Sequence, residues 1–161
     1  MAILLIKMAL IISFGIILYQ DMKDRQVYWF LFLFVGLCGG VLFYLKTLPE
    51  LFYMAVFLNS VFVFLLLGIV FLYTKFKLKT DFSKAIGLGD VFLLFALVLG
   101  CASISFMILL PSAFIFSLIL HLVISKKQKT NTVPLAGYMS LFFGITYIGS
   151  WFGIINTLYQ V

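Results

Sequence analysis

Charged residues are scarce in this chain, and their scarcity excludes most soluble folds. They make up 10% of the 161 residues, whereas hydrophobic residues make up 65% and the mean hydropathy is +1.27. Soluble domains carry about 25% charged and about 45–50% apolar residues, and a chain of this length still exposes much of its surface. A bilayer accommodates such a surface, so the composition predicts an integral membrane protein.

Cysteine and histidine are also rare, which removes two common kinds of site. Cys38 and Cys101 lie apart inside apolar runs, without the paired spacing of a zinc site or a disulfide framework. His121 is the sole histidine, and we expect it to make a polar contact between helices. Neither a metal nor a cofactor is expected.

The net charge of +6 does not indicate a nucleic-acid partner. The basic residues sit in short gaps between apolar runs and do not form a stripe on a polar surface. Such charges are typical of loops beside anionic headgroups. The lipid bilayer is therefore the expected partner of this surface, and the sequence indicates no oligomeric state.

Apolar runs of about 20 residues can cross a hydrocarbon core of about 30 Å as helices. Four such runs stand alone, at about 2–19, 27–45, 51–73 and 135–158. The first lacks the basic start and the small-residue cleavage site of a signal peptide, so we expect it to be a retained span.

A fifth run extends from Leu88 to Ile124 and would form a single helix of roughly 55 Å. Because this length far exceeds the bilayer, the run must fold back, and Gly100–Ser103 is the expected turn between two short spans. The sequence therefore predicts one all-α domain over residues 1–161, a polytopic membrane protein with six transmembrane helices.

Loop charge orients these spans. With six spans, nine of the eleven basic residues fall on one side: Lys23, Arg25, Lys75, Lys77, Lys79, Lys84, Lys126, Lys127 and Lys129. Because cytoplasmic loops are enriched in Lys and Arg, this side is predicted to be cytoplasmic, with both termini outside. The expected location is the inner (cytoplasmic) membrane.

Two of the five acidic residues are predicted to share the cytoplasmic face. Asp21 ends the first span, and Asp90 follows Gly87-Leu88-Gly89 at the start of the fourth. Glu50 and Asp81 lie in predicted loops, where a solvated charge or an Asx turn is usual. Helix capping accounts for an Asp in a first turn, as at Asp90, but the helix dipole disfavours an anion at a C-terminus, as at Asp21.

Shared chemistry explains both carboxylates together. Two carboxylates in one site cannot easily both ionise, so the pair is expected to hold one proton. The ionised member can then take a proton from water while its partner donates one to a substrate carbonyl, which hydrolyses an amide. Gly87 and Gly89 lack Cβ atoms and would allow a close backbone approach or unusual dihedral angles.

The same residues resemble a known family. Gly87-Leu88-Gly89-Asp90 matches the GxGD motif, and its position resembles that in type IV prepilin peptidases and archaeal preflagellin peptidases. The segment from Asp21 to Tyr28 resembles the family's D-x-[KR]-x-[RK]-x-I-P pattern, with Val27 for Ile and Tyr28 for Pro, and its register selects Asp21 over Asp24. Residues 133–138, Val-Pro-Leu-Ala-Gly-Tyr, resemble the proline-containing motif that opens the family's last span.

This resemblance implies an aspartic endopeptidase with Asp21 and Asp90 as catalytic residues and Gly87 and Gly89 supporting the motif or the substrate. The implied substrates are type IV prepilin-like membrane proteins with short basic leader peptides. The cysteine-bearing segment of the bifunctional enzymes has no counterpart here, so methyltransferase activity is not implied. Phe92 stands where the family often has a basic residue. A proton-coupled small transporter that uses the same carboxylates and an inactive membrane scaffold remain open alternatives.

Overall fold

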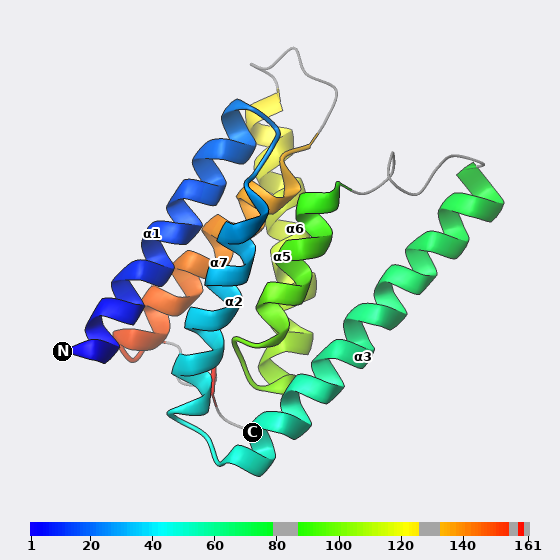
Figure 1. Cartoon of the computed structure of the whole chain (residues 1–161). Helices are drawn as coiled ribbons and strands as arrows, with labels where there is room; N and C mark the ends of the chain where they lie inside the picture. Colours follow the sequence, from blue (N-terminus) through cyan, green and yellow to red (C-terminus); the bar gives the residue numbers. More distant parts are fainter. Residues whose placement is uncertain (79–86, 126–132, 155–157, 160–161) are drawn as a thin grey trace.

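The computed structural model describes residues 1–78, 87–125, 133–154 and 158–159. All regular elements in this part of the chain are helical, which confirms the all-α prediction (Figure 1). They are α1 (Ala2–Lys23), α2 (Trp29–Tyr44), α3 (Pro49–Tyr73), the π-helical segment η1 (Thr74–Leu78), α5 (Leu88–Val98), α6 (Ser103–Ser125) and α7 (Leu135–Trp151).

Three helices within the described residues are long and apolar enough to cross a membrane. They cover Ala2–Lys23, Pro49–Lys77 and Ser103–Ile124, and two shorter apolar helices are α2 and α5. α6 is a full-length helix of 23 residues, so the prediction that both halves of the folded-back run are short is wrong for its second half. These helices are those of a membrane protein.

α7 connects several helices of the bundle. It packs against α1, α6 and α5, while α2 packs against α1 and α5. Large apolar side chains fill the interior, among them the fully buried Leu10, Ile17, Leu93, Leu97 and Phe143. Phe14 of α1 lies against Tyr147 of α7, with ring centroids 6.0 Å apart. The bundle thus joins the first helix of the chain to the last.

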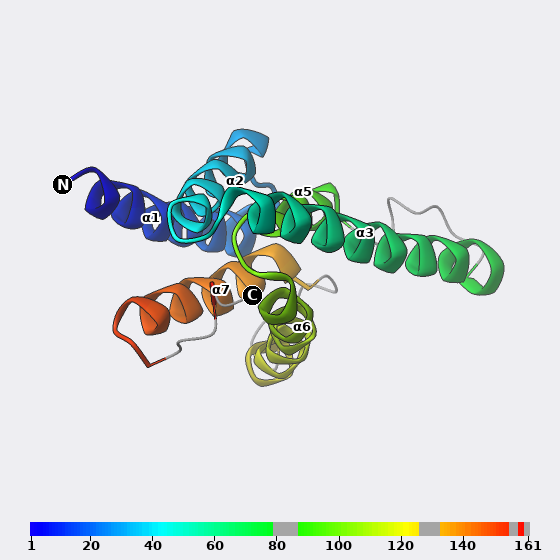
Figure 2. The ribbon, with the colours of Figure 1, turned by 90° about the horizontal axis from the view of Figure 1, so that it is seen from below.

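α3 lies at the edge of the bundle and diverges from it. Its buried residues are Ala55, Asn59 and Val63, all in its first two thirds, and it contacts α5 and α6. Figures 1 and 2 both show the later part of α3 extending away from the other helices. The first part of α3 therefore anchors it to the rest of the protein.

The turn between α5 and α6 is buried, although its backbone is irregular. α5 has 11 residues and is about 16 Å long, so the turn needs partners from protein rather than from lipid. The Asn59 side-chain amide donates to the carbonyl oxygens of Val98 at 3.1 Å and Cys101 at 3.0 Å. The Tyr147 hydroxyl donates to the carbonyl oxygen of Gly100 at 2.7 Å. The predicted turn at Gly100–Ser103 is confirmed, and α3 and α7 satisfy its carbonyl groups.

α7 ends earlier than its apolar run predicts. The run continues to Leu158, but the helix stops at Trp151, where Gly153 adopts a φ of 77°. The amides of Gly153 and Ile154 donate to the carbonyl oxygens of Ser150 and Gly149, which is a Schellman motif. Hydropathy alone could not locate this end, because the residues that follow are also apolar.

We predict that Asn59→Ala lowers the free energy of unfolding by about 1–3 kcal/mol, because it leaves buried carbonyl groups without donors. Unfolding in detergent micelles, followed by circular dichroism, measures the change. Ser60→Ala is the matched control, since the Ser60 hydroxyl bonds only to the Val56 carbonyl of its own helix. Equal stability of the two variants would contradict this role of Asn59.

Candidate active site

The first turn of α7 obtains its hydrogen-bond partners from other helices. The first amides of any helix have no intrahelical acceptor, and the residue before α7 is Pro134, which has no side-chain cap. The Leu135 amide donates to the Val133 carbonyl, and the Tyr138 amide donates to the Pro134 carbonyl. The amides of Ala136 and Gly137 remain, and each needs an acceptor from elsewhere in the protein.

Asp21 supplies the acceptor for Gly137. The Gly137 amide donates to Oδ2 of Asp21 at 2.6 Å, and the aspartate is 9% exposed. A hydrogen bond to an ionised acceptor is shorter and roughly twice as strong as a neutral one. The expectation that capping cannot explain Asp21 is therefore wrong. Asp21 sits unfavourably at the end of its own helix, but it caps the start of α7.

Asp90 serves two helix starts. It is the third residue of α5, and the backbone of Gly87, the N-cap, stabilises its carboxylate. The backbone of Ala136 in α7 stabilises the same carboxylate. Asp90 thus caps its own helix, as expected, and also the first turn of α7.

The two predicted catalytic residues therefore meet at consecutive amides. Neighbouring residues have Cα atoms about 3.8 Å apart, so acceptors of the Ala136 and Gly137 amides are held close together. The charge of Asp21 acts directly on Asp90. Figure 1 shows the C-terminal end of α1 and the starts of α5 and α7 at the same end of the bundle. We call Asp21 and Asp90 the dyad.

Glycine permits a close approach around the dyad. A Cβ atom on Gly137 would lie 3.2 Å from Cβ of Asp21 and 3.1 Å from its Oδ2, and one on Gly87 would lie 3.1 Å from Oδ2 of Asp90. Gly89 is less constrained, since its nearest neighbour would be the Phe32 ring at 3.5 Å. Gly87 has an ordinary φ of −66°. Of the roles predicted for the motif glycines, the structure shows close approach rather than an unusual dihedral.

The remaining acidic residues lie away from the dyad. Asp24 is the exposed C-cap of α1, and Glu50 is exposed in the first turn of α3. Asp81 lies outside the described residues. Of the acids whose position the structure gives, only Asp21 and Asp90 reach α7. Within this part of the chain, no three His, Cys, Asp or Glu side chains gather as a metal site.

Tyr28 and Phe92, two of the departures from the family pattern, are both exposed. Tyr28 is 64% exposed at the N-cap of α2, and its amide donates to the Gln20 side chain at 3.3 Å, a bond that proline could not make. Phe92 is 49% exposed and stacks on Phe32, with centroids 6.3 Å apart. Neither side chain takes part in the hydrogen bonds of the dyad.

Sequence reasoning missed the residues that hold the dyad. Ala136 and Gly137 contribute through their backbone amides, and the type of side chain does not predict this role. The available signal was Pro134, because a helix that begins after proline lacks a side-chain cap of its own. Arg25 was predicted as a loop charge and as the second basic residue of the family pattern; the structure adds that it acts electrostatically on Asp21 and adopts a left-handed conformation with a φ of 56°.

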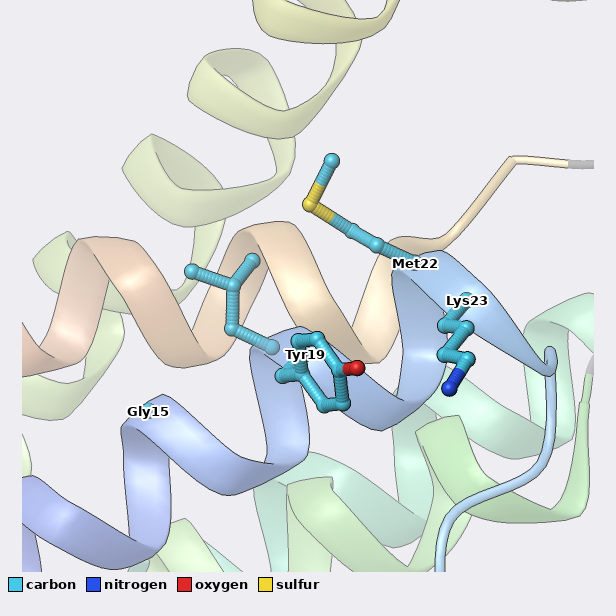
Figure 3. A pocket seen from close by; sticks show the side chains of 5 residues that line it. Gly15, Tyr19, Met22 and Lys23 are labelled. Atoms are coloured by element: carbon cyan, nitrogen blue, oxygen red, sulfur yellow. The ribbon is translucent and has the colours of Figure 1, made fainter.

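A hollow of about 330 Å³ lies on α1 but does not include the dyad. Its lining residues are Gly15, Leu18, Tyr19, Met22 and Lys23 (Figure 3). The Lys23 ammonium lies 5.5 Å from the centroid of the Tyr19 ring. Asp21 belongs to the same turn of α1 and instead points toward α7. The hollow and the dyad are therefore separate features of the helix.

We predict that Gly137→Ala destabilises the protein by about 1–3 kcal/mol, because the new methyl group overpacks the contact between α1 and α7. Thermal unfolding in detergent measures the effect. Gly15→Ala is the control, since a Cβ there meets nothing within 4 Å, and alanine should stabilise the helix by about 0.5–1 kcal/mol. A Gly137→Ala protein as stable as the wild type would contradict the close contact.

Comparison with protein-family models, with curated proteins and with solved structures finds no match to this chain.

Proposed function

We propose that the chain is a membrane aspartic endopeptidase that resembles type IV prepilin peptidases. It cleaves short basic leader peptides from prepilin-like precursors at the cytoplasmic face of the inner membrane. The observation that supports this most is the meeting of Asp21 and Asp90 at consecutive amides of α7. Two carboxylates from helices far apart in the sequence lie close to the same helix start, as the motif resemblance requires.

The proposed orientation uses six spans. Each α-helix crosses or enters the membrane, with the dyad end facing the cytoplasm and both termini outside. The placement of the basic residues supports this orientation. Lys23 ends α1 and Arg25 follows it, and Lys75 and Lys77 lie in η1, whereas Lys46 lies between α2 and α3 at the opposite end. The basic end would lie beside anionic headgroups.

The proposed reaction needs one ionised and one protonated carboxyl group. The ionised member takes a proton from a water molecule as that water attacks the scissile carbonyl carbon, and the protonated member donates its proton to the carbonyl oxygen. Collapse of the tetrahedral intermediate breaks the C–N bond, and the amine product leaves with a proton from the dyad. The fixed amides of Ala136 and Gly137 keep both carboxylates oriented throughout.

Capping alone does not account for this pair. A neutral Asn or Ser caps a helix about as well as Asp, and each additional buried charge has a desolvation cost. A site that places two acids where neutral acceptors suffice is therefore better explained by chemistry that needs a proton. Substitution with asparagine separates the two roles, because its side-chain oxygen keeps the hydrogen bond from the α7 amide and loses the acid function.

We expect Asp21→Asn and Asp90→Asn each to abolish cleavage of a co-expressed prepilin-like precursor, while the protein still inserts and folds. The mass of the precursor, with and without its leader, is the measurement. Asp24→Asn is the matched control and should cleave normally, since Asp24 is exposed and lies off the site. Full cleavage by either dyad variant would refute the proposal.

The two alternatives give different results in the same system. A proton-coupled transporter predicts proton flux into liposomes that depends on Asp21 and Asp90, with no change in precursor mass. An inactive scaffold predicts neither flux nor cleavage by the wild-type protein.

The pH dependence of cleavage offers a further test. Because one carboxyl must be protonated and the other ionised, the rate should fall at low pH, where both are protonated, and at high pH, where both are ionised. Cleavage of a precursor reconstituted with the protein in liposomes measures the profile. A rate that declines on one side only would contradict a mechanism that uses two carboxyl groups.

A further inference from the structure

Tyr138 carries a buried hydroxyl group that the fold does not use. The side chain is 0% exposed, and its Oη has no hydrogen-bond partner among the described residues. An unpaired buried hydroxyl is destabilising, and lipid offers no water in compensation. Phenylalanine would fill the same space without this cost, so the hydroxyl needs an explanation other than packing.

Tyr147 on the same helix shows what a structural tyrosine does here. It is equally buried, at 1% exposure, but its hydroxyl donates to the Gly100 carbonyl at 2.7 Å and supports the buried turn. The two tyrosines therefore differ in one respect, the presence of a partner. This contrast makes them a matched pair within α7.

Tyr138 lies next to the residue that holds one member of the dyad. It directly follows Gly137, whose amide holds Asp21, and the charges of Arg25 and Asp21 both act on it. On its other side lies His121 of α6, with ring centroids 6.4 Å apart. The Nδ1 atom of His121 is likewise buried without a partner among the described residues. Two unpaired polar groups thus lie together, and one of them belongs to the residue that follows Gly137.

We infer that the Tyr138 hydroxyl binds the substrate main chain by donating a hydrogen bond to a carbonyl oxygen beside the cleaved peptide bond. This inference rests on the proposed function. A phenol is a suitable donor for such a carbonyl, and the enclosed site would strengthen the bond. Asp21 is itself 9% exposed, so a peptide must open this part of the bundle to reach the dyad, and the adjacent hydroxyl becomes accessible with it. The unpaired hydroxyl of the resting protein then gains its partner from the precursor.

The test compares Tyr138→Phe with Tyr147→Phe in the full-length protein. Tyr138→Phe should leave the melting temperature unchanged or raise it, yet lower kcat/KM for precursor cleavage about tenfold, which corresponds to one hydrogen bond of about 1.4 kcal/mol. Tyr147→Phe should lower the melting temperature, yet keep kcat/KM per folded molecule near the wild-type value. A structural role alone cannot produce this crossed pattern.

Binding provides a second measurement that does not depend on turnover. In the Asp90→Asn background, adding Tyr138→Phe should weaken capture of the uncleaved precursor in detergent, while adding Tyr147→Phe should not. Unchanged cleavage by Tyr138→Phe, or a melting temperature lowered as in Tyr147→Phe, would overturn the inference. Absence of cleavage by the wild-type protein would instead refute the proposed function, so the two failures are distinguishable.

Discussion

The start of α7 depends on acceptors that its own sequence does not provide. Because Pro134 precedes the helix, the amides of Ala136 and Gly137 find their partners in Asp90 and Asp21. These bonds tie α1 and α5 to the central helix at one end of the bundle. The Ser140 hydroxyl extends the contact by donating to the Phe14 carbonyl of α1 at 3.2 Å. If α7 moved away from α1 and α5, the carboxylates of Asp21 and Asp90 and the amides of Gly137 and Ala136 would lose these partners.

Hydrogen bonds between helices also hold the opposite end of the bundle, at the turn between α5 and α6. α5 is short, and the turn that follows it is buried, so its position depends on the hydrogen bonds from Asn59 and Tyr147. Tyr147 belongs to α7, as do the amides that hold the dyad. α7 therefore contacts α5 near both of its ends. A rigid scaffold of this kind suits catalytic groups that must keep their orientation.

The sequence was sufficient for those features that follow from hydropathy and glycine placement. The all-α architecture and the reversal at Gly100–Ser103 agree with the structure, because apolar runs and glycine placement predict them. The end of α7 at Trp151 was beyond hydropathy, since the next residues are equally apolar and only Gly153 marks the stop. The role of α7 was also missed, because backbone amides at Ala136 and Gly137 leave no trace in side-chain chemistry.

The most direct test of the account is the amide NMR spectrum of ¹⁵N-labelled protein in detergent micelles. Asp21→Ala removes the acceptor of the Gly137 amide, and Asp90→Ala removes that of the Ala136 amide, whereas the Gly144 amide, inside α7, is a reference. The account predicts that within α7 each variant shifts its own partner amide most and leaves Gly144 almost unmoved. Gly137 and Ala136 resonances that stay in place in both variants would contradict the shared helix start, and with it the dyad.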